Sequence, residues 1–176
     1  MHNKAKHNEA VKRTIEYFDR AGTVLTEKEK GEITVFDFDF DELEHVGLQL
    51  LVYVNTPRVC AKELVLFPGQ SCVEHHHPTL GVVPGKEETF RCRWGEVYLY
   101  VPGPETADRK AVIPDSMKDA VTVFHEIVLR PGEQHTLYPD TPHWFQGGPE
   151  GAVISEFSTT NTDNVDRFTD PRIKRI

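Results

Sequence analysis

The sequence predicts an all-β fold, a barrel or a sandwich of short strands, preceded by one helix. Two observations carry this prediction. Runs rich in β-branched and aromatic residues follow one another from residue 33 onward and are separated by clusters of Pro, Gly or Asp. Helical periodicity leads the chain instead of alternating with these runs, as a parallel α/β sheet would require. The strand-like runs are residues 35–40, 48–55, 60–67, 88–101, 120–131 and 151–159.

The N-terminal helix is expected over residues 8–20. Three apolar residues recur at i, i+4 and i+7 and share one helical face: Val11, Ile15 and Phe18. Asn8 is a suitable N-cap, and Gly22 is a typical residue to follow a helix end. The charged residues 26–30 predict one further helical turn.

Length and composition indicate one soluble globular domain. We expect a helical segment, residues 1–32, to pack on a barrel formed by residues 33–176. The formal net charge of −8 argues against a nucleic-acid or anionic-membrane surface, which would need a basic patch. No run approaches the roughly 20 apolar residues of a membrane span, and the N-terminus shows no signal-peptide pattern. The three cysteines lack a CxxC spacing, which favours the reducing cytoplasm over a disulfide framework.

Residues 68–78, PGQSCVEHHHP, carry the strongest chemical signal. Alternate side chains of a strand share a face, so His75 and His77 point the same way and His76 points away. Glu88 begins the next strand-like run and can add a carboxylate. His143 follows two nearby prolines, which fix its backbone. Together these residues predict a site for one divalent metal ion.

The spacing of these residues resembles the two motifs of the cupin superfamily, with Gly69 before His75, Gly95 after the glutamate and a late histidine. The resemblance implies a cupin-type barrel, a double-stranded β-helix or jelly roll. One feature departs from the family pattern, because the distance along the chain from His77 to the glutamate is longer than usual. Residues 78–87 would carry this insertion.

Glu87 competes with Glu88 for the role of carboxylate ligand. We favour Glu88 because its distance from Gly95 fits the motif and because it shares a strand face with Phe90 and Cys92. Three neutral imidazoles and one carboxylate suit Mn, Fe, Co, Ni or Zn better than Ca or Mg, which prefer oxygen ligands. An octahedral ion with four protein ligands would keep two open positions for two adjacent substrate oxygens.

Lys62 and Glu156 are the candidate catalytic residues. Lys62 alternates in phase with leucines, and Glu156 lies in an apolar run, so each either faces the pocket or lies at a solvent-exposed strand edge. A metal ion, a carboxylate that is not a ligand and a lysine suit aldose–ketose isomerisation. The metal would stabilise an enediolate, the carboxylate would move a proton between carbons, and the lysine would protonate or steady an oxygen. The same set would serve lyases and epimerases.

Several other residues near the predicted site have two interpretations. Trp144 and Phe145 flank His143 and either offer a ring face to a sugar or pack in the core. Arg91 and Arg93 alternate opposite to Glu88 and are expected to face outward. Two further histidines, His125 and His135, are not placed by the pattern, and His135 is the better candidate to approach the pocket.

Three stretches are similar to the D-lyxose ketol-isomerase family: residues 58–103, 138–148 and 155–173. The most specific piece is GKEETFRCRWGEVYLY, residues 85–100. The resemblance implies a manganese-dependent cupin isomerase that interconverts D-lyxose and D-xylulose, with some activity on D-mannose and D-fructose.

Carried over residue by residue, the family pattern places metal ligands at His75, His77, Glu88 and His143 and the catalytic pair at Lys62 and Glu156. Asp166 and Arg167 either close the pocket or form a surface ion pair. Cupin barrels often pair through edge strands, so a homodimer is expected.

Three alternatives remain at this point. An iron-dependent cupin dioxygenase would use the same ligands in a largely apolar pocket. A non-catalytic sugar-binding cupin would lack a ligand-free carboxylate near the metal, so Glu156 would point away. A phosphosugar isomerase would use Lys86 or an arginine to hold a phosphate, although the sequence has no glycine-rich phosphate loop.

Overall fold

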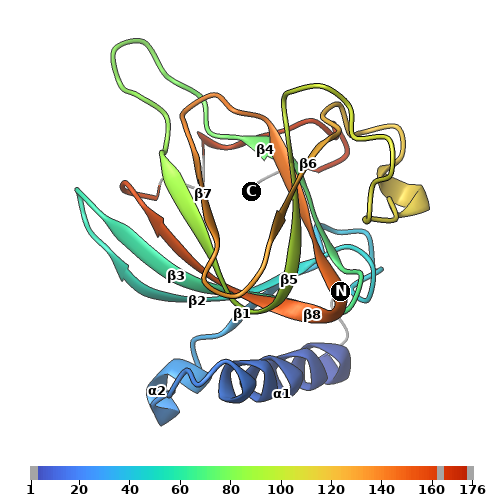
Figure 1. The fold of residues 1–176 in the computed structure, drawn as a ribbon. Helices are drawn as coiled ribbons and strands as arrows, with labels where there is room; N and C mark the ends of the chain where they lie inside the picture. Colours follow the sequence, from blue (N-terminus) through green and yellow to red (C-terminus); the bar gives the residue numbers. More distant parts are fainter. Residues whose placement is uncertain (1–3, 162–164, 174–176) are drawn as a thin grey trace.

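A single curled sheet contains the nine strands of the computed structural model, which describes residues 4–161 and 165–173 (Figure 1). The main path of the sheet is β1-β2-β3-β8-β4-β9, and β5 extends it by pairing with β8, β6 and β7. The strands are β1 (Thr34–Phe36), β2 (Leu48–Asn55), β3 (Cys60–Leu66), β4 (Ser71–His76), β5 (Glu88–Val101), β6 (His125–Leu129), β7 (Gln134–Leu137), β8 (His143–Ser158) and β9 (Arg167–Phe168). The prediction of an all-β, cupin-type barrel with an N-terminal helix is confirmed.

The two longest strands, β5 and β8, turn the sheet back on itself. They pair along three stretches, separated by register shifts between Cys92 and Trp94 and between Gly95 and Val97, which bend the strands. Gly95 has a φ of 73°, and a Cβ on it would lie 2.0 Å from the carbonyl oxygen of Gly151. Only glycine fits this close backbone crossing.

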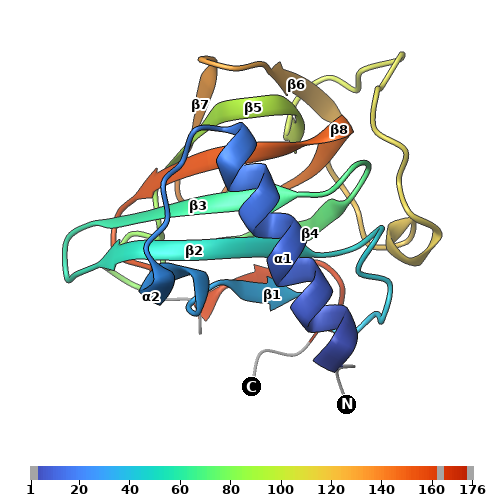
Figure 2. The ribbon, with the colours of Figure 1, turned by 90° about the horizontal axis from the view of Figure 1, so that it is seen from below.

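Helix α1 (Lys4–Arg20) lies across the outer face of the sheet, where it contacts β1, β2, β3 and β8 (Figure 2). It buries Tyr17 and Phe18 against the sheet, and a fully buried phenylalanine contributes about 1.5–3 kcal/mol. The predicted start at residue 8 was wrong, because Asn8 lies inside the helix. Residues 4–6 are Lys, Ala and Lys, which favour helix, and Lys6 forms an ion pair with Asp41 at 3.1 Å.

The predicted second helical turn is α2 (Glu27–Lys30). Thr26 is its N-cap and forms a capping box with Glu29: each side chain accepts the other residue's backbone N–H. The prediction for residues 26–30 is confirmed.

Two predicted strands are shorter in the structure, and one is longer. Residues 35–40 continue as a strand only to Phe36, because Phe38 and Asp39 adopt φ values of 53° and 64°. The run 120–131 becomes strand only at His125. Upstream of His125, the N–H groups of Thr122 and Val123 bond to the carboxylate of Glu74 instead of to a neighbouring strand. Strand β8 begins at His143, well before the predicted residue 151.

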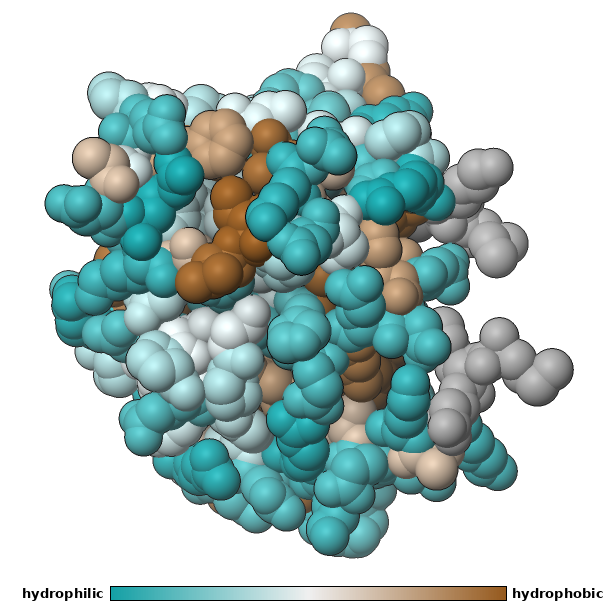
Figure 3. Space-filling view, turned by 90° about the vertical axis from the view of Figure 1, so that its right-hand side faces the viewer, coloured by the Kyte–Doolittle hydropathy of each residue, from teal (hydrophilic) through white to brown (hydrophobic). Residues whose placement is uncertain are grey.

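Three apolar clusters pack against the inner and outer faces of the barrel wall. One fills part of the interior, one lies between α1 and the sheet, and one packs the segment 102–124 against β4, β5 and β8. The long polar segment 102–119 contains the short 3-10 helix η1 (Asp115–Met117) and buries Met117 in the third cluster. On the side of the molecule that carries this segment, the surface is largely hydrophilic with scattered hydrophobic residues (Figure 3). Neither described α-helix has the length and apolar character needed to cross a membrane.

Candidate metal centre and catalytic pocket

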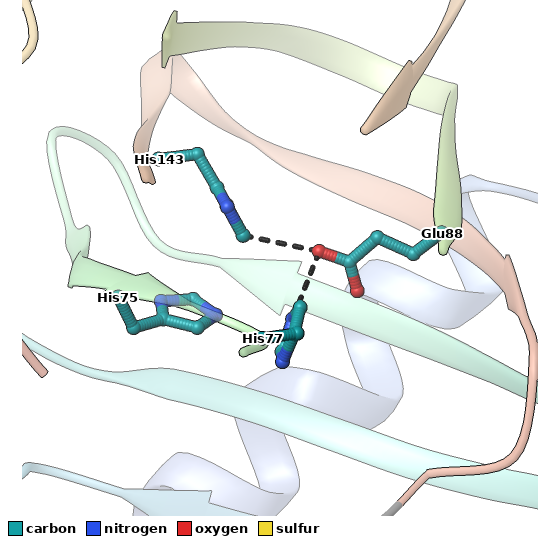
Figure 4. A group of neighbouring side chains, drawn as sticks. All are labelled: His75, His77, Glu88 and His143. Atoms are coloured by element: carbon teal, nitrogen blue, oxygen red, sulfur yellow. Dashed lines mark hydrogen bonds and ion pairs between the residues drawn. The ribbon is translucent and has the colours of Figure 1, made fainter. Parts of the chain in front are cut away.

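Four side chains from β4, β5, β8 and the residue that follows β4 converge inside the barrel: His75, His77, Glu88 and His143 (Figure 4). One nitrogen or oxygen atom of each residue lies within 4.8 Å of the corresponding atom of every other. His75 lies on β4 opposite His143 of β8, His77 follows the end of β4, and Glu88 is the first residue of β5. These four residues could hold one metal ion, and Glu87 is exposed, away from them.

Each histidine is oriented by a hydrogen bond at Nδ1. His75 and His143 lie 2.9 Å from the carbonyl oxygens of Val73 and Thr141, which can only accept, so both Nδ1 atoms donate. His77 Nδ1 lies 2.7 Å from a carboxylate oxygen of Asp166. These contacts direct the three Nε2 atoms toward the common centre, an arrangement that histidine metal ligands commonly show.

The donor set at this centre fits a divalent cation. The buried Nε2 atom of His143 lies 3.0 Å from Oε1 of Glu88 and makes no aligned hydrogen bond. His77 Nε2 lies 3.2 Å from the same oxygen. A cation at this centre would give the buried Nε2 atom of His143 a partner and would share the Glu88 oxygen with both imidazoles.

The pKa values of His75 and His77 shift in opposite directions. Burial and the neighbouring imidazoles of His143 and His77 hold the pKa of His75 well below its usual range. Burial also lowers the pKa of His77, but the hydrogen bonds to Asp166 and Glu88 outweigh it and raise the pKa to about 9. His77 is therefore protonated near neutral pH in the metal-free protein. It would have to lose a proton to solvent before its Nε2 atom could bind a metal.

The Glu88 carboxylate is held in its ionised form. Burial would raise the pKa of Glu88, but the Lys86 ammonium and the neighbouring imidazoles of His143 and His77 keep it well below its usual range. An ionised carboxylate is the form that a metal ligand requires.

Lys62 and Glu156 lie side by side in the same cavity. They are directly opposite each other on β3 and β8, and Lys62 Nζ is 3.5 Å from Oε1 of Glu156. Their exposed fractions are 5% and 4%. The interpretation as strand-edge residues in solvent is therefore wrong, and the interpretation that faces them into the pocket is confirmed.

Lys86 is a member of this cluster that the sequence analysis did not assign to catalysis. Its Nζ lies 2.5 Å from Oε2 of Glu88 and 2.8 Å from Oε1 of Glu156, so it joins the candidate metal ligand to the candidate catalytic carboxylate. Burial lowers the pKa of Lys86, but the two carboxylates outweigh it and raise the pKa above its usual range. Its position two residues before Glu88 is the signal that could have identified it, but Lys86 itself precedes β5, so strand alternation does not fix where its side chain points.

These groups line a cavity of about 560 Å³. Its polar side includes Lys62, Lys86, Glu156 and Asp166 together with three of the four candidate ligands. Its apolar side is formed by Val35, Phe36, Phe38, Leu48, Leu50, Val52, Leu64, Cys72, Phe90, Phe145, Phe168 and Ile173.

Of the other residues that the sequence suggested near the site, some line the cavity and others lie outside it. Phe145 lines the cavity, whereas Trp144 is fully buried outside it and stacks on Tyr100 with ring centroids 4.0 Å apart. Asp166 contacts His77 in the cavity, and Arg167 is exposed. His135 pairs with β5 and is not among the residues that line the cavity, so the preference for it was wrong.

Arg93 is exposed and Arg91 bonds to Gln134 at the surface, as expected for the outward face. His76 also lies outside the cavity lining, opposite to its two neighbours.

Solved structures of L-ribose isomerases share this fold. The enzyme from Cellulomonas parahominis superposes with a TM-score of 0.79 at 15% sequence identity, covering 97% of this chain and 94% of that one. The enzyme from Acinetobacter sp. DL28, in complex with L-ribose, gives the same TM-score, identity and coverage.

Sequence comparison identifies the family. Residues 98–176 match the family described as D-lyxose isomerase. A D-lyxose ketol-isomerase of Thermofilum sp. (strain ex4484_79) is 54% identical over 176 residues, which cover 100% of this chain and 98% of the relative. A D-lyxose/D-mannose isomerase of Thermosediminibacter oceani is 54% identical over 176 residues, covering 100% of this chain and 97% of the relative. A D-lyxose ketol-isomerase of Cohnella laeviribosi is 55% identical over 168 residues, covering 96% and 92%. The chain therefore belongs to the D-lyxose isomerase family.

Proposed function

We propose that this protein is a metal-dependent aldose–ketose isomerase that interconverts D-lyxose and D-xylulose and also accepts D-mannose and D-fructose. One observation carries the proposal: a carboxylate and two lysines share a buried cavity with a four-residue candidate metal site. The relatives that are 54–55% identical along nearly the whole chain support the choice of sugar.

His75, His77, Glu88 and His143 hold the metal in this proposal. Their mixed nitrogen and oxygen donors suit Mn²⁺, with Co²⁺, Fe²⁺, Ni²⁺ and Zn²⁺ as substitutes. When bound, the ion polarises the adjacent carbonyl and hydroxyl oxygens of the sugar and stabilises the negative charge that develops on them. Glu88 supplies the only carboxylate of the set, and Lys86 fixes that carboxylate by contacting its second oxygen at 2.5 Å.

Glu156 transfers the proton between C1 and C2 of the sugar. Its carboxylate is not one of the four candidate ligands, so it keeps its basic oxygens for the substrate. Two ammonium groups, those of Lys62 and Lys86, contact Oε1 and fix its position. The carboxylate is 4% exposed, so bulk water has little access to the transferred proton.

Lys62 acts on the sugar oxygens. It approaches the carboxylate from β3, whereas Lys86 approaches from the side of Glu88. Lys86 contacts the carboxylates of both Glu88 and Glu156, which makes it a positioning group. Lys62 lines the cavity beside the proposed base, which supports its role as the donor to an oxygen of the substrate.

The alternatives have less support. Glu156 lies in the cavity, which favours an isomerase over a sugar-binding cupin. The buried lysine–carboxylate cluster is not needed for oxygen activation in an apolar pocket, so it also favours an isomerase over a dioxygenase. Lys86 is engaged by two carboxylates, which disfavours its use as a phosphate clamp.

Two further proposals concern the cell and the assembly. Cys60, Cys72 and Cys92 are buried, and no disulfide joins them within the described residues, which supports the reducing cytoplasm as the compartment. We also propose a homodimer, which sedimentation of the purified protein tests directly.

A turnover panel tests the proposed activity. The Mn²⁺-loaded protein is incubated with free D-lyxose, D-mannose, D-ribose and D-xylose and with phosphorylated aldoses, and ketose products are separated by chromatography. D-xylulose from D-lyxose, with slower formation of D-fructose from D-mannose, is the expected result. Conversion of phosphorylated aldoses alone, or of no sugar, would contradict the proposal.

A further inference from the structure

A buried carboxylate lies on the reverse face of the strand that carries the candidate metal ligands. Glu74 precedes His75 on β4, is 1% exposed and does not line the cavity. It accepts hydrogen bonds from Thr122 Oγ1 at 2.7 Å, Thr122 N at 2.6 Å, Val123 N at 3.2 Å and Thr169 Oγ1 at 2.6 Å. Four donors around one carboxylate use its full accepting capacity.

One of these bonds fixes the C-terminal segment, residues 165–173. Besides the hydroxyl bond, Thr169 N donates to the backbone oxygen of Glu74 at 3.1 Å. The neighbouring β9 residues pair with β4, Phe168 opposite His75. The segment is therefore anchored to β4 at Glu74, with the bonded carboxylate buried.

The same segment supplies a residue to the metal centre. Asp166, three positions before Thr169, contacts His77 Nδ1 at 2.7 Å and is 8% exposed. Phe168 and Ile173 of this segment also line the cavity. The orientation of His77 thus depends on where the segment is held, and Glu74 helps to hold it.

We propose that Glu74 is a positioning residue of the metal centre, which acts by fixing the C-terminal segment so that Asp166 orients His77. The inference rests on the proposed metal site. It assigns to a side chain outside the cavity an effect on metal affinity that is transmitted through Thr169 and Asp166.

The test is a double-mutant cycle on the full chain, read out as the Mn²⁺ dissociation constant by calorimetry. Asp166→Asn should weaken binding by about 10- to 100-fold, as loss of a ligand's hydrogen-bond partner commonly does. Glu74→Gln keeps the size of the side chain but replaces one accepting oxygen with an NH₂ group, and it should weaken binding by about 10-fold. In the Asp166→Asn background, Glu74→Gln should have little further effect, because its route to the metal is already lost.

Two further variants complete the design. Glu63→Gln removes another buried carboxylate, which bonds Ser155 on the outer face of β3, and should leave Mn²⁺ affinity unchanged. Thr169→Val removes one bond to Glu74 and should weaken affinity in the same direction as Glu74→Gln, which keeps the test available if Glu74→Gln does not fold.

The outcomes separate this inference from the proposed function. Unchanged Mn²⁺ affinity in folded Glu74→Gln or Thr169→Val, or an equal loss with and without Asp166, would overturn the role of Glu74 while leaving the metal site intact. Absence of Mn²⁺ binding by the wild-type protein would instead overturn the metal site itself.

Discussion

Individual charged groups inside the barrel are arranged as a chain of alternating charge. Lys62 contacts Glu156, Glu156 contacts Lys86, and Lys86 contacts Glu88, with distances from 2.5 to 3.5 Å. A buried charge is tolerated when it is paired, and each of these groups has a partner. The arrangement leaves Glu156 next to the candidate metal ligands without making it one of them.

Replacement of Glu156 tests its role in proton transfer. Glu156→Gln should retain Mn²⁺ and lower kcat by about 10²- to 10⁴-fold, because an amide cannot act as the base. The measurement is kcat for D-lyxose together with the metal content. With 2-deuterated D-lyxose, the wild-type protein should exchange part of the label with solvent during turnover.

Glu87→Gln is the matched control, since Glu87 is exposed beside Glu88, and it should keep full activity. A metal-loaded Glu156→Gln protein with unchanged kcat would remove Glu156 from the mechanism.

Replacement of Glu63 tests how a buried carboxyl affects the free energy of unfolding. Burial raises the pKa of Glu63, against smaller opposite effects of Ser155 and Arg93. A raised pKa in the folded state means that this carboxyl supports folding most at low pH and loses that contribution as pH rises through the folded-state pKa. Glu63→Gln, which stays neutral, should therefore raise the free energy of unfolding at pH 7 by up to about 1 kcal/mol.

Urea unfolding at about pH 4 and at pH 7 measures the Glu63 effect. The gain from Glu63→Gln should shrink toward zero at the lower pH. A gain of the same size at both pH values would show that the carboxyl does not titrate differently in the folded and unfolded states.

The sequence predicted the candidate metal ligands and catalytic residues, but it did not predict all of the contacts between them. The spacing of His75, His77, Glu88 and His143 was sufficient for a candidate metal site, because strand alternation fixes the face. The partners of Lys86 and Asp166 depend on the cross-strand register and on the path of the C-terminal segment, which one sequence does not specify.

The ends of some strands follow from the local sequence, whereas the ends of others depend on contacts with distant residues. Strands β2 and β5 begin and end at the predicted residues, since their apolar patterns are bounded by Pro, Gly and polar residues. The predicted strand start near residue 120 failed because the N–H groups of Thr122 and Val123 bond to Glu74, 48 and 49 positions away. Local patterns therefore predicted most strands, and a distant carboxylate decided where one began.

Replacement of Gly95 tests the close backbone crossing between β5 and β8. Gly95→Ala should lower the free energy of unfolding by more than about 2 kcal/mol, because the new methyl group would meet the Gly151 carbonyl oxygen in addition to the strain of positive φ. Chemical unfolding gives the value. Gly69→Ala is the matched control, with a φ of 68° and no atom within 4 Å of the added carbon, and it should cost only about 1 kcal/mol. Equal losses in both variants would contradict the close backbone crossing.

Across the whole molecule, the candidate metal centre joins segments that are far apart in the chain. It brings together β4, β5, β8 and the segment that holds Asp166. A ligand that binds only the folded state stabilises it by mass action, so the centre links metal binding to the stability of the complete barrel.

Metal binding should therefore raise the unfolding temperature of the metal-free protein. Mn²⁺ at 100 times its dissociation constant should add about 2.7 kcal/mol of stability. His77→Ala should lose most of this gain in a thermal melt, whereas His76→Ala should keep it, because His76 is outside the cavity lining. An equal gain in both variants would place the metal elsewhere.

The most direct test of the central claim is turnover of D-lyxose by one preparation before and after metal removal. The protein is dialysed against a chelator, titrated with Mn²⁺ and assayed for D-xylulose at each step. We predict no turnover without metal and recovery that reaches its maximum at one Mn²⁺ per chain. Full turnover by the metal-free protein, or no D-xylulose at any Mn²⁺ level, would contradict the assignment of His75, His77, Glu88 and His143 as the metal centre of a sugar isomerase.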